Sequence, residues 1–131
     1  MEDFVTFEIA KKLKEKGFNI PSYFYYRTDD KFLHNAVVGK PLVYCDKIDD
    51  DIVIAPTISQ VSKWLRNNKK TMISILPVAF NEKENKFNKY YCTIYYATKE
   101  FVFESHERPD TFETYEECAL DAIEYSLDNL I

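Results

Sequence analysis

The chain has 131 residues, of which 46% are hydrophobic and 30% charged, and its formal net charge is −5. A chain of this length can bury a core as one domain, residues 1–131, and this composition argues against a disordered protein. Because 10 Tyr and 10 Phe accompany only 2 Gly, we expect a well-packed protein rich in strands.

Charge is distributed unevenly along the chain. Residues 1–99 carry 16 Lys and Arg against 12 Asp and Glu, a balance of +4, whereas residues 100–131 carry one Arg against 10 acids, a balance of −9. This distribution disfavours nucleic-acid binding through the whole surface, because clustered Lys and Arg are what neutralise phosphates. The charge distribution is nevertheless compatible with a local basic face.

The cysteines and the N-terminus bear on location and cofactors. Cys45, Cys92 and Cys118 are odd in number and far apart, so they indicate neither a disulfide framework nor a zinc site. The chain starts with acidic residues where a secretory signal is basic, and no apolar run approaches the roughly 20 residues of a membrane span. We therefore expect a cytoplasmic protein with no membrane contact, no metal and no other cofactor.

The first third of the chain predicts one helix and several short strands. An amphipathic helix is expected over residues 4–16, capped by Asp3 and ended by Gly17. Strands are expected over 22–27 and 32–38, with a turn at 28–31, and a short extended piece over 42–45. An acidic connection follows at 46–51, and the spacing of its carboxylates does not match a calcium-binding loop.

The central stretch, residues 52–78, has the pattern of strand, helix and strand. Pro56 ends the first strand, and Thr57 with Gln60 forms a capping box that starts the helix. The helix is expected to bury an apolar stripe of Ile58, Val61, Trp64 and Leu65. Its basic end is the nearest approach to a phosphate-binding patch, although cations at a helix C-terminus are stabilised by the helix dipole alone. That end comprises Lys63, Arg66, Lys69 and Lys70.

A strand meander and a second capped helix complete the chain. A strand over 71–80, which Pro77 confines to an edge or a bulge, is joined by a polar loop at 81–88 to a strand over 89–98, and a third strand covers 101–103. Thr114 and Glu117 cap the last helix. Alternation divides the second strand into two aromatic faces, so its second face is expected to be covered or to be an interface. The faces are Tyr90, Cys92, Ile94 and Tyr96 against Tyr91, Thr93, Tyr95 and Ala97.

No catalytic residue is predicted. A Cys/His nucleophile pair would have to unite His34 or His106 with a cysteine, and Cys92 and Cys118 fall on a strand and on an apolar helix stripe. With only Gly17 and Gly39 in the chain, no glycine-rich phosphate loop can form.

Two segments carry a resemblance. Ala55-Pro56-Thr57 precedes Trp64-Leu65-Arg66, and Thr114-Tyr115-Glu116-Glu117 precedes Ala119 and Ala122. Through these motifs residues 52–131 resemble a family of short uncharacterised proteins of bacterial phages, prophages and gut-bacterial genomes. The motifs are helix caps and apolar stripes, so the resemblance concerns a fold and implies no reaction, cofactor or site residue.

The sequence thus predicts an α+β protein: a mainly antiparallel sheet of about four to six strands with three helices packed against it. We expect a small non-enzymatic accessory protein of a phage or mobile element that acts by protein contact, with a second copy of itself as one candidate partner. The alternative is a nucleic-acid-binding regulator that uses a local basic face; a small hydrolase or transferase would need a pocket around His34 or His106. The predicted contact surface is Lys63, Arg66, Lys69, Lys70, Tyr91 and Tyr95.

Overall fold

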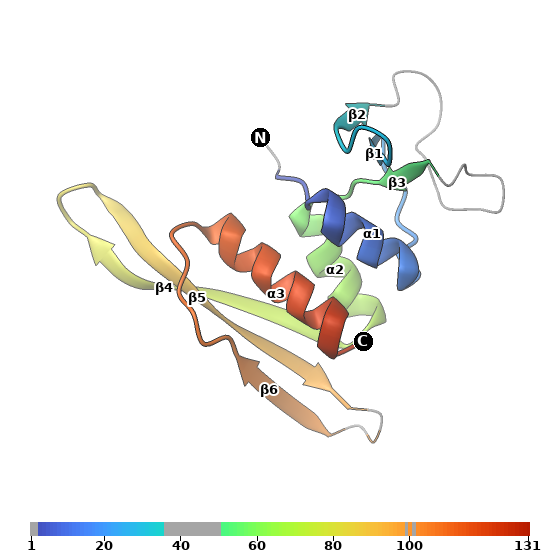
Figure 1. Ribbon diagram of the computed structural model, residues 1–131. Helices are drawn as coiled ribbons and strands as arrows, with labels where there is room; N and C mark the ends of the chain where they lie inside the picture. Colours follow the sequence, from blue (N-terminus) through green and yellow to red (C-terminus); the bar gives the residue numbers. More distant parts are fainter. Residues whose placement is uncertain (1–2, 36–50, 99, 101) are drawn as a thin grey trace. The chain divides into compact units, whose positions relative to one another are not determined.

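The computed structural model describes residues 3–35, 51–98, 100 and 102–131 (Figure 1). Three helices and six strands lie in these residues, and the strands form two antiparallel three-stranded sheets, ordered β2-β1-β3 and β4-β5-β6. In chain order the elements are α1 (Phe7–Glu15), β1 (Phe24–Arg27), β2 (Leu33–Asn35), β3 (Ile52–Ile54), α2 (Ile58–Asn68), β4 (Thr71–Asn81), β5 (Lys86–Ala97), β6 (Phe103–Glu107) and α3 (Tyr115–Asn129). The predicted α+β class is confirmed, with the six strands divided between two sheets.

The chain separates into two compact units, Met1–Trp64 and Leu65–Ile131, with one sheet in each. The single domain over residues 1–131 stays a prediction. Several expected features fall outside the described residues, namely the end of the second strand at 36–38, the extended piece at 42–45 with Cys45, and the acidic connection at 46–50. No helix of the described residues combines the length and apolarity that crossing a bilayer requires.

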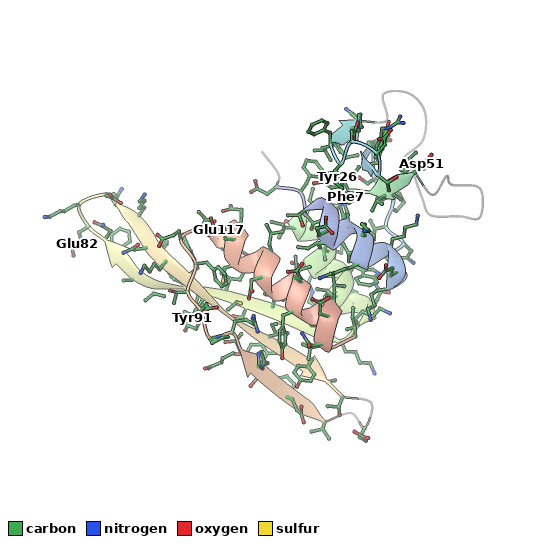
Figure 2. All side chains as sticks on the ribbon, viewed as in Figure 1. Phe7, Tyr26, Asp51, Glu82, Tyr91 and Glu117 are labelled. Carbon is green, nitrogen blue, oxygen red and sulfur yellow. The ribbon has the colours of Figure 1, made fainter. Side chains whose placement is uncertain are left out.

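The first unit is built around β1, whose Tyr25 pairs with His34 of β2 on one side and Ile54 of β3 on the other. Phe7 and Tyr26, both labelled in Figure 2, meet edge to face with ring centroids 5.9 Å apart. The fully or almost fully buried side chains of this unit include Val5, Ile9, Leu13, Phe18, Val53, Ile54, Val61 and Trp64. The apolar stripes that the sequence predicts for α1 and α2 are therefore core.

Helix α1 begins later than predicted. Its cap is Thr6 rather than Asp3, since Thr6 Oγ1 accepts a hydrogen bond from the backbone N of Ile9 at 3.3 Å. Residues 3–5 pair instead with the residues that lead into α2: Val5 N donates to Pro56 O at 3.1 Å, and Ile58 N donates to Asp3 O at 2.9 Å. This long-range pairing prevents the helix from starting at residue 4. Gly17, with φ of +85°, follows the end of the helix as expected.

The start of α2 is the boundary that the sequence predicts best. Thr57 N donates to Gln60 Oε1 at 2.9 Å, and Gln60 N donates back to Thr57 Oγ1 at 3.2 Å. The predicted capping box is confirmed, because these two bonds satisfy two backbone donors reciprocally.

The second unit is a three-stranded meander with α3 across one face. β4 pairs with β5 from Thr71↔Tyr96 to Asn81↔Lys86, and β5 pairs with β6 from Thr93↔Glu107 to Ala97↔Phe103. The third strand therefore lies at 103–107, beyond the predicted 101–103.

The connecting turn spans only residues 82–85, so the predicted loop at 81–88 is too long. The strands continue further because the Phe80 and Phe87 rings pack edge to face at 5.5 Å, and because Asn81 Oδ1 accepts from Glu84 N at 3.2 Å. Asn85 takes the left-handed conformation, with φ of +52°.

Pro77 lies on the edge strand β4, as predicted, and its backbone N points away from β5. Its register partner Tyr90 exchanges both backbone hydrogen bonds with Phe112, each at 2.8 Å, so Tyr90 directs its N–H and C=O away from β4. The missing N–H of Pro77 therefore removes no bond from the β4–β5 ladder. The pairing offset is the same before and after it, at Leu76↔Tyr91 and Ala79↔Asn88.

Candidate functional site

Helix α3 covers one face of the β4-β5-β6 sheet. Cys92 and Ile94 of β5 are fully buried against Cys118 and Ala122 of α3. Small side chains on the helix allow the close approach that this packing needs. Around this centre pack the partly buried residues Ile73, Ile75, Tyr90, Phe112, Tyr125 and Leu130. The predicted assignment of Tyr90, Cys92 and Ile94 to one face of the strand is confirmed.

Arg108 and His106 fasten β6 to the same helix. Arg108 Nε donates to Asp121 Oδ2 at 2.7 Å, and this hydrogen bond raises the pKa of the guanidinium. The Tyr125 ring stacks on His106 with centroids 4.4 Å apart, and the Arg108 guanidinium carbon lies 4.3 Å from the centroid of the same ring. Arg108, the one Lys or Arg among residues 100–131, thus connects β6 to Asp121 and Tyr125 of α3.

The opposite face of the sheet, which we call the open face, keeps large apolar side chains exposed. Strand register sets Met72 beside Tyr95 and Leu76 beside Tyr91, alternating with the residues that face α3. Phe103 is 72% exposed, and Val78, Met72 and Leu76 are each about half exposed, at 52%, 50% and 48%. The apolar and aromatic residues of the open face are Met72, Leu76, Val78, Tyr91, Tyr95 and Phe103; Figure 2 labels Tyr91. By register the polar Ser74, Thr93 and Ser105 lie on the same face.

A groove of about 440 Å³ lies at the end of the open face where α2 leads into β4. Its aromatic wall is formed by Tyr95 and Phe103, whose rings stack with centroids 5.8 Å apart and planes 13° from parallel. Met72, the register partner of Tyr95, adds an aliphatic surface, and Ala97, the register partner of Phe103, adds only a methyl group. The groove is therefore mainly apolar and open along one side of two stacked rings.

Two cations line the same groove, Arg66 and Lys70. Arg66 stands in the last turn of α2. Lys70 connects the helix to β4, where its φ of +52° turns the chain and its carbonyl accepts from Ala97 N at 3.2 Å. Both side chains are exposed, and the backbone that carries Lys70 is fixed to the sheet.

Glu104 on β6 is hydrogen-bonded to a residue of the groove lining. Tyr96, another lining residue, donates from Oη to Glu104 Oε2 at 2.9 Å, and this hydrogen bond raises the pKa of the Tyr96 hydroxyl. The carboxylate is thus engaged by Tyr96. Of the described residues that line the groove, none carries a carboxylate.

The groove unites part of the predicted contact surface. Arg66, Lys70 and Tyr95 line it, and Tyr91 lies on the same sheet face further along β5. Lys69 follows the helix but does not line the groove, and Lys63 belongs to the unit Met1–Trp64. Met72 and Phe103 were not predicted, because only the strand register shows that they lie beside Tyr95 and Ala97.

Each of the two histidines packs on a tyrosine ring, so structural contacts account for both imidazoles. His34 Nε2 lies 2.9 Å from Asp30 Oδ2 on the exposed β1–β2 turn, and its ring stacks on Tyr25 at 5.4 Å. His106 packs on Tyr125, and its Nε2 is buried with no hydrogen-bond partner among the described residues. Among the described residues, neither arrangement includes a cysteine.

The two described cysteines are buried side by side between β5 and α3. Burial raises the pKa of the Cys92 thiol to about 12, with a further contribution from Cys118, and burial also raises the pKa of Cys118. Thiols in such surroundings stay protonated at neutral pH and are poor nucleophiles. Their role in this structure is packing.

Within the described residues, no group of three or more His, Cys, Asp or Glu could hold a metal ion.

No protein-family model, no curated protein and no solved structure matches the chain.

Proposed function

We propose that the protein is a non-enzymatic protein-interaction module whose contact surface is the open face of the β4-β5-β6 sheet. One observation carries the proposal: α3 covers one face of this sheet, and the other face leaves four large apolar side chains about half exposed or more and two tyrosines partly exposed. Antiparallel sheets whose second face meets only water carry polar residues there.

The size of the open face supports a protein partner. Four of the six side chains are 48% to 72% exposed, and Tyr91 and Tyr95 are partly exposed. With about 150–250 Å² of surface for a large side chain, they offer on the order of 500 Å² of apolar surface. Monomeric proteins rarely leave a contiguous apolar patch larger than a few hundred Å², whereas one side of a standard interface buries about 800 Å². The open face is therefore on the scale of an interface.

The proposed setting is the cytoplasm of a bacterial cell, in association with a phage or mobile element. The phage setting rests on the resemblance of residues 52–131 alone. The cytoplasmic location rests on three widely spaced cysteines, which signal no disulfide framework.

A matched pair of variants tests the proposal. Peptides are selected from a random library on the wild-type protein and then measured on Leu76→Asp and on Thr111→Asp; Thr111 is exposed in the connection between β6 and α3, outside the open face. We expect selected peptides to bind the wild type and to lose at least about tenfold in affinity on Leu76→Asp, since a charge would be buried under an apolar partner. Equal binding to wild type and Leu76→Asp would contradict the proposal.

Light scattering distinguishes a second copy of the chain from other partners. If the open face binds itself, the mass rises from monomer to dimer with concentration, and Leu76→Asp returns it to the monomer. If the protein is a monomer at all concentrations and no selected peptide depends on Leu76 for binding, the proposal of protein contact through this face is wrong.

A further inference from the structure

We infer that the groove at the end of the open face binds an aromatic side chain flanked by carboxylates, in an acidic segment of a partner protein. This inference rests on the proposed function and specifies the chemistry of the partner. It follows from two properties of the same groove lining, a stacked aromatic wall and a pair of cations.

The aromatic wall selects a flat ring. Tyr95 and Phe103 are nearly parallel, and Phe103 is 72% exposed, so one face of its ring is free to take another ring in offset or edge-to-face contact. Met72 completes the contact, because a thioether adapts its shape and interacts favourably with aromatic rings. A cavity of about 440 Å³ has room for one such side chain and its immediate neighbours.

The two cations select negative charge beside the ring. Arg66 and Lys70 are four residues apart and line the same groove. A guanidinium can hold a carboxylate with two parallel hydrogen bonds, which adds orientation to attraction. Because no described lining residue is acidic, a partner's carboxylates would meet no like charge in the groove lining.

A second groove on the same sheet has the opposite character and serves as an internal comparison. It lies by the β4–β5 turn, has a volume of about 410 Å³, and is lined by Tyr90 and Tyr115 together with Glu84, Glu113 and Glu116. Its lining also holds one cation, Lys86, whose Nζ lies 3.3 Å from Glu84 Oε2. Aromatic walls are therefore common to both grooves, whereas acidic residues outnumber the cation in the second and are absent from the described lining of the first. An acidic segment discriminates between them by charge.

The test is an NMR titration of the full chain with the pentapeptide acetyl-Asp-Glu-Phe-Glu-Asp-amide. We expect the amide signals of Lys70, Tyr95, Ala97 and Phe103 to shift, with an affinity that falls as salt is added. Two control peptides separate the contributions: alanine in place of phenylalanine, and lysines in place of the acids. Each is expected to bind about tenfold more weakly or worse, the scale of a lost ring contact or of two lost surface ion pairs.

Matched charge reversals locate the site on the protein. Arg66→Glu is expected to weaken the pentapeptide about tenfold, and Lys69→Glu, which changes the net charge equally but lies outside the groove lining, by no more than about threefold. Equal losses for the two variants would overturn the inference, because they would show a general effect of charge. Equal binding of the lysine peptide would overturn it as well.

A short oligothymidylate is the competing probe. If it shifts the same amides and binds more tightly than the pentapeptide, the groove recognises nucleic acid and the inference is wrong. If library peptides bind through Leu76 but the pentapeptide leaves the groove amides unmoved, the inference fails while the proposed function stands.

Discussion

The two faces of the β4-β5-β6 sheet are made from the same strands and have opposite environments. On one face Cys92 and Ile94 have no exposed surface under α3. On the other, Met72, Leu76 and Val78 keep about half of theirs. Successive residues of a strand point to opposite faces, so Met72 and Leu76 lie on the opposite face of β4 from Ile73 and Ile75, which pack under α3.

The composition of the faces does not explain this difference, because both are rich in aromatic and aliphatic residues. The difference lies in what packs on them. α3 brings the small residues Cys118 and Ala122 to the first face, and these allow a helix to approach closely. The open face reduces its exposure through its own side chains: Thr93, between Tyr91 and Tyr95, is only 8% exposed, and Tyr95 stacks with Phe103. A sheet face can thus be apolar either because it is core or because it is available for contact.

The largest expected effect is a difference in stability between alanine variants of the two faces. Ile94→Ala is expected to lower the free energy of unfolding by about 3 kcal/mol, since it removes buried methyl groups and leaves a cavity. Leu76→Ala on the open face is expected to cost less than about 1 kcal/mol, because that side chain is already 48% exposed. Urea unfolding followed by circular dichroism measures both, and hydrogen exchange of the β5 amides assigns the loss to this unit. Similar losses for the two variants would show that the open face is core in solution.

The covered face is also expected to respond to alkaline pH. The folded chain holds the pKa of Cys92 at about 12, above the value of about 8.5 for an unfolded thiol. The stabilisation from the protonated thiol is therefore complete below about pH 8 and is lost as the pH rises toward 12. Between pH 7 and pH 10 we expect a loss of roughly 2 kcal/mol.

Other groups titrate in this range, so the control is Cys92→Ala. This variant is less stable at pH 7, but its free energy of unfolding should fall less between pH 7 and pH 10 than that of the wild type. Parallel pH profiles for the two proteins would mean that the thiol is not the group responsible.

The smallest expected effect concerns the outer edge of β4. The strand carries no charged residue from Thr71 to Asn81, and Pro77 removes one of its outward donors. Pro77→Thr is expected to change stability by less than about 0.5 kcal/mol and to increase self-association in sedimentation velocity, because it restores an unpaired N–H on an apolar edge. A loss above 1 kcal/mol would show that residue 77 takes part in the β4–β5 ladder.

Local signals account for much of the fold that could be predicted. The capping box of Thr57 and Gln60, the stripe that buries Val61 and Trp64, and the alternation along β5 each depend on residues a few positions apart. Such patterns are set by helix and strand geometry, which the sequence specifies directly. The start of α1 could not be predicted, because it depends on hydrogen bonds between residues 3–5 and 56–58.

The candidate site shows the same division. The sequence alone determined that Arg66 and Lys70 form a basic helix end and that Tyr95 lies on an aromatic strand face. Only the tertiary structure decided that these residues share a groove with Met72 and Phe103, and that one aromatic face of β5 is core while the other is open. The physical reason is that periodicity fixes which side chains share a face, whereas strand register and the placement of α3 decide which neighbours they meet and which face meets solvent.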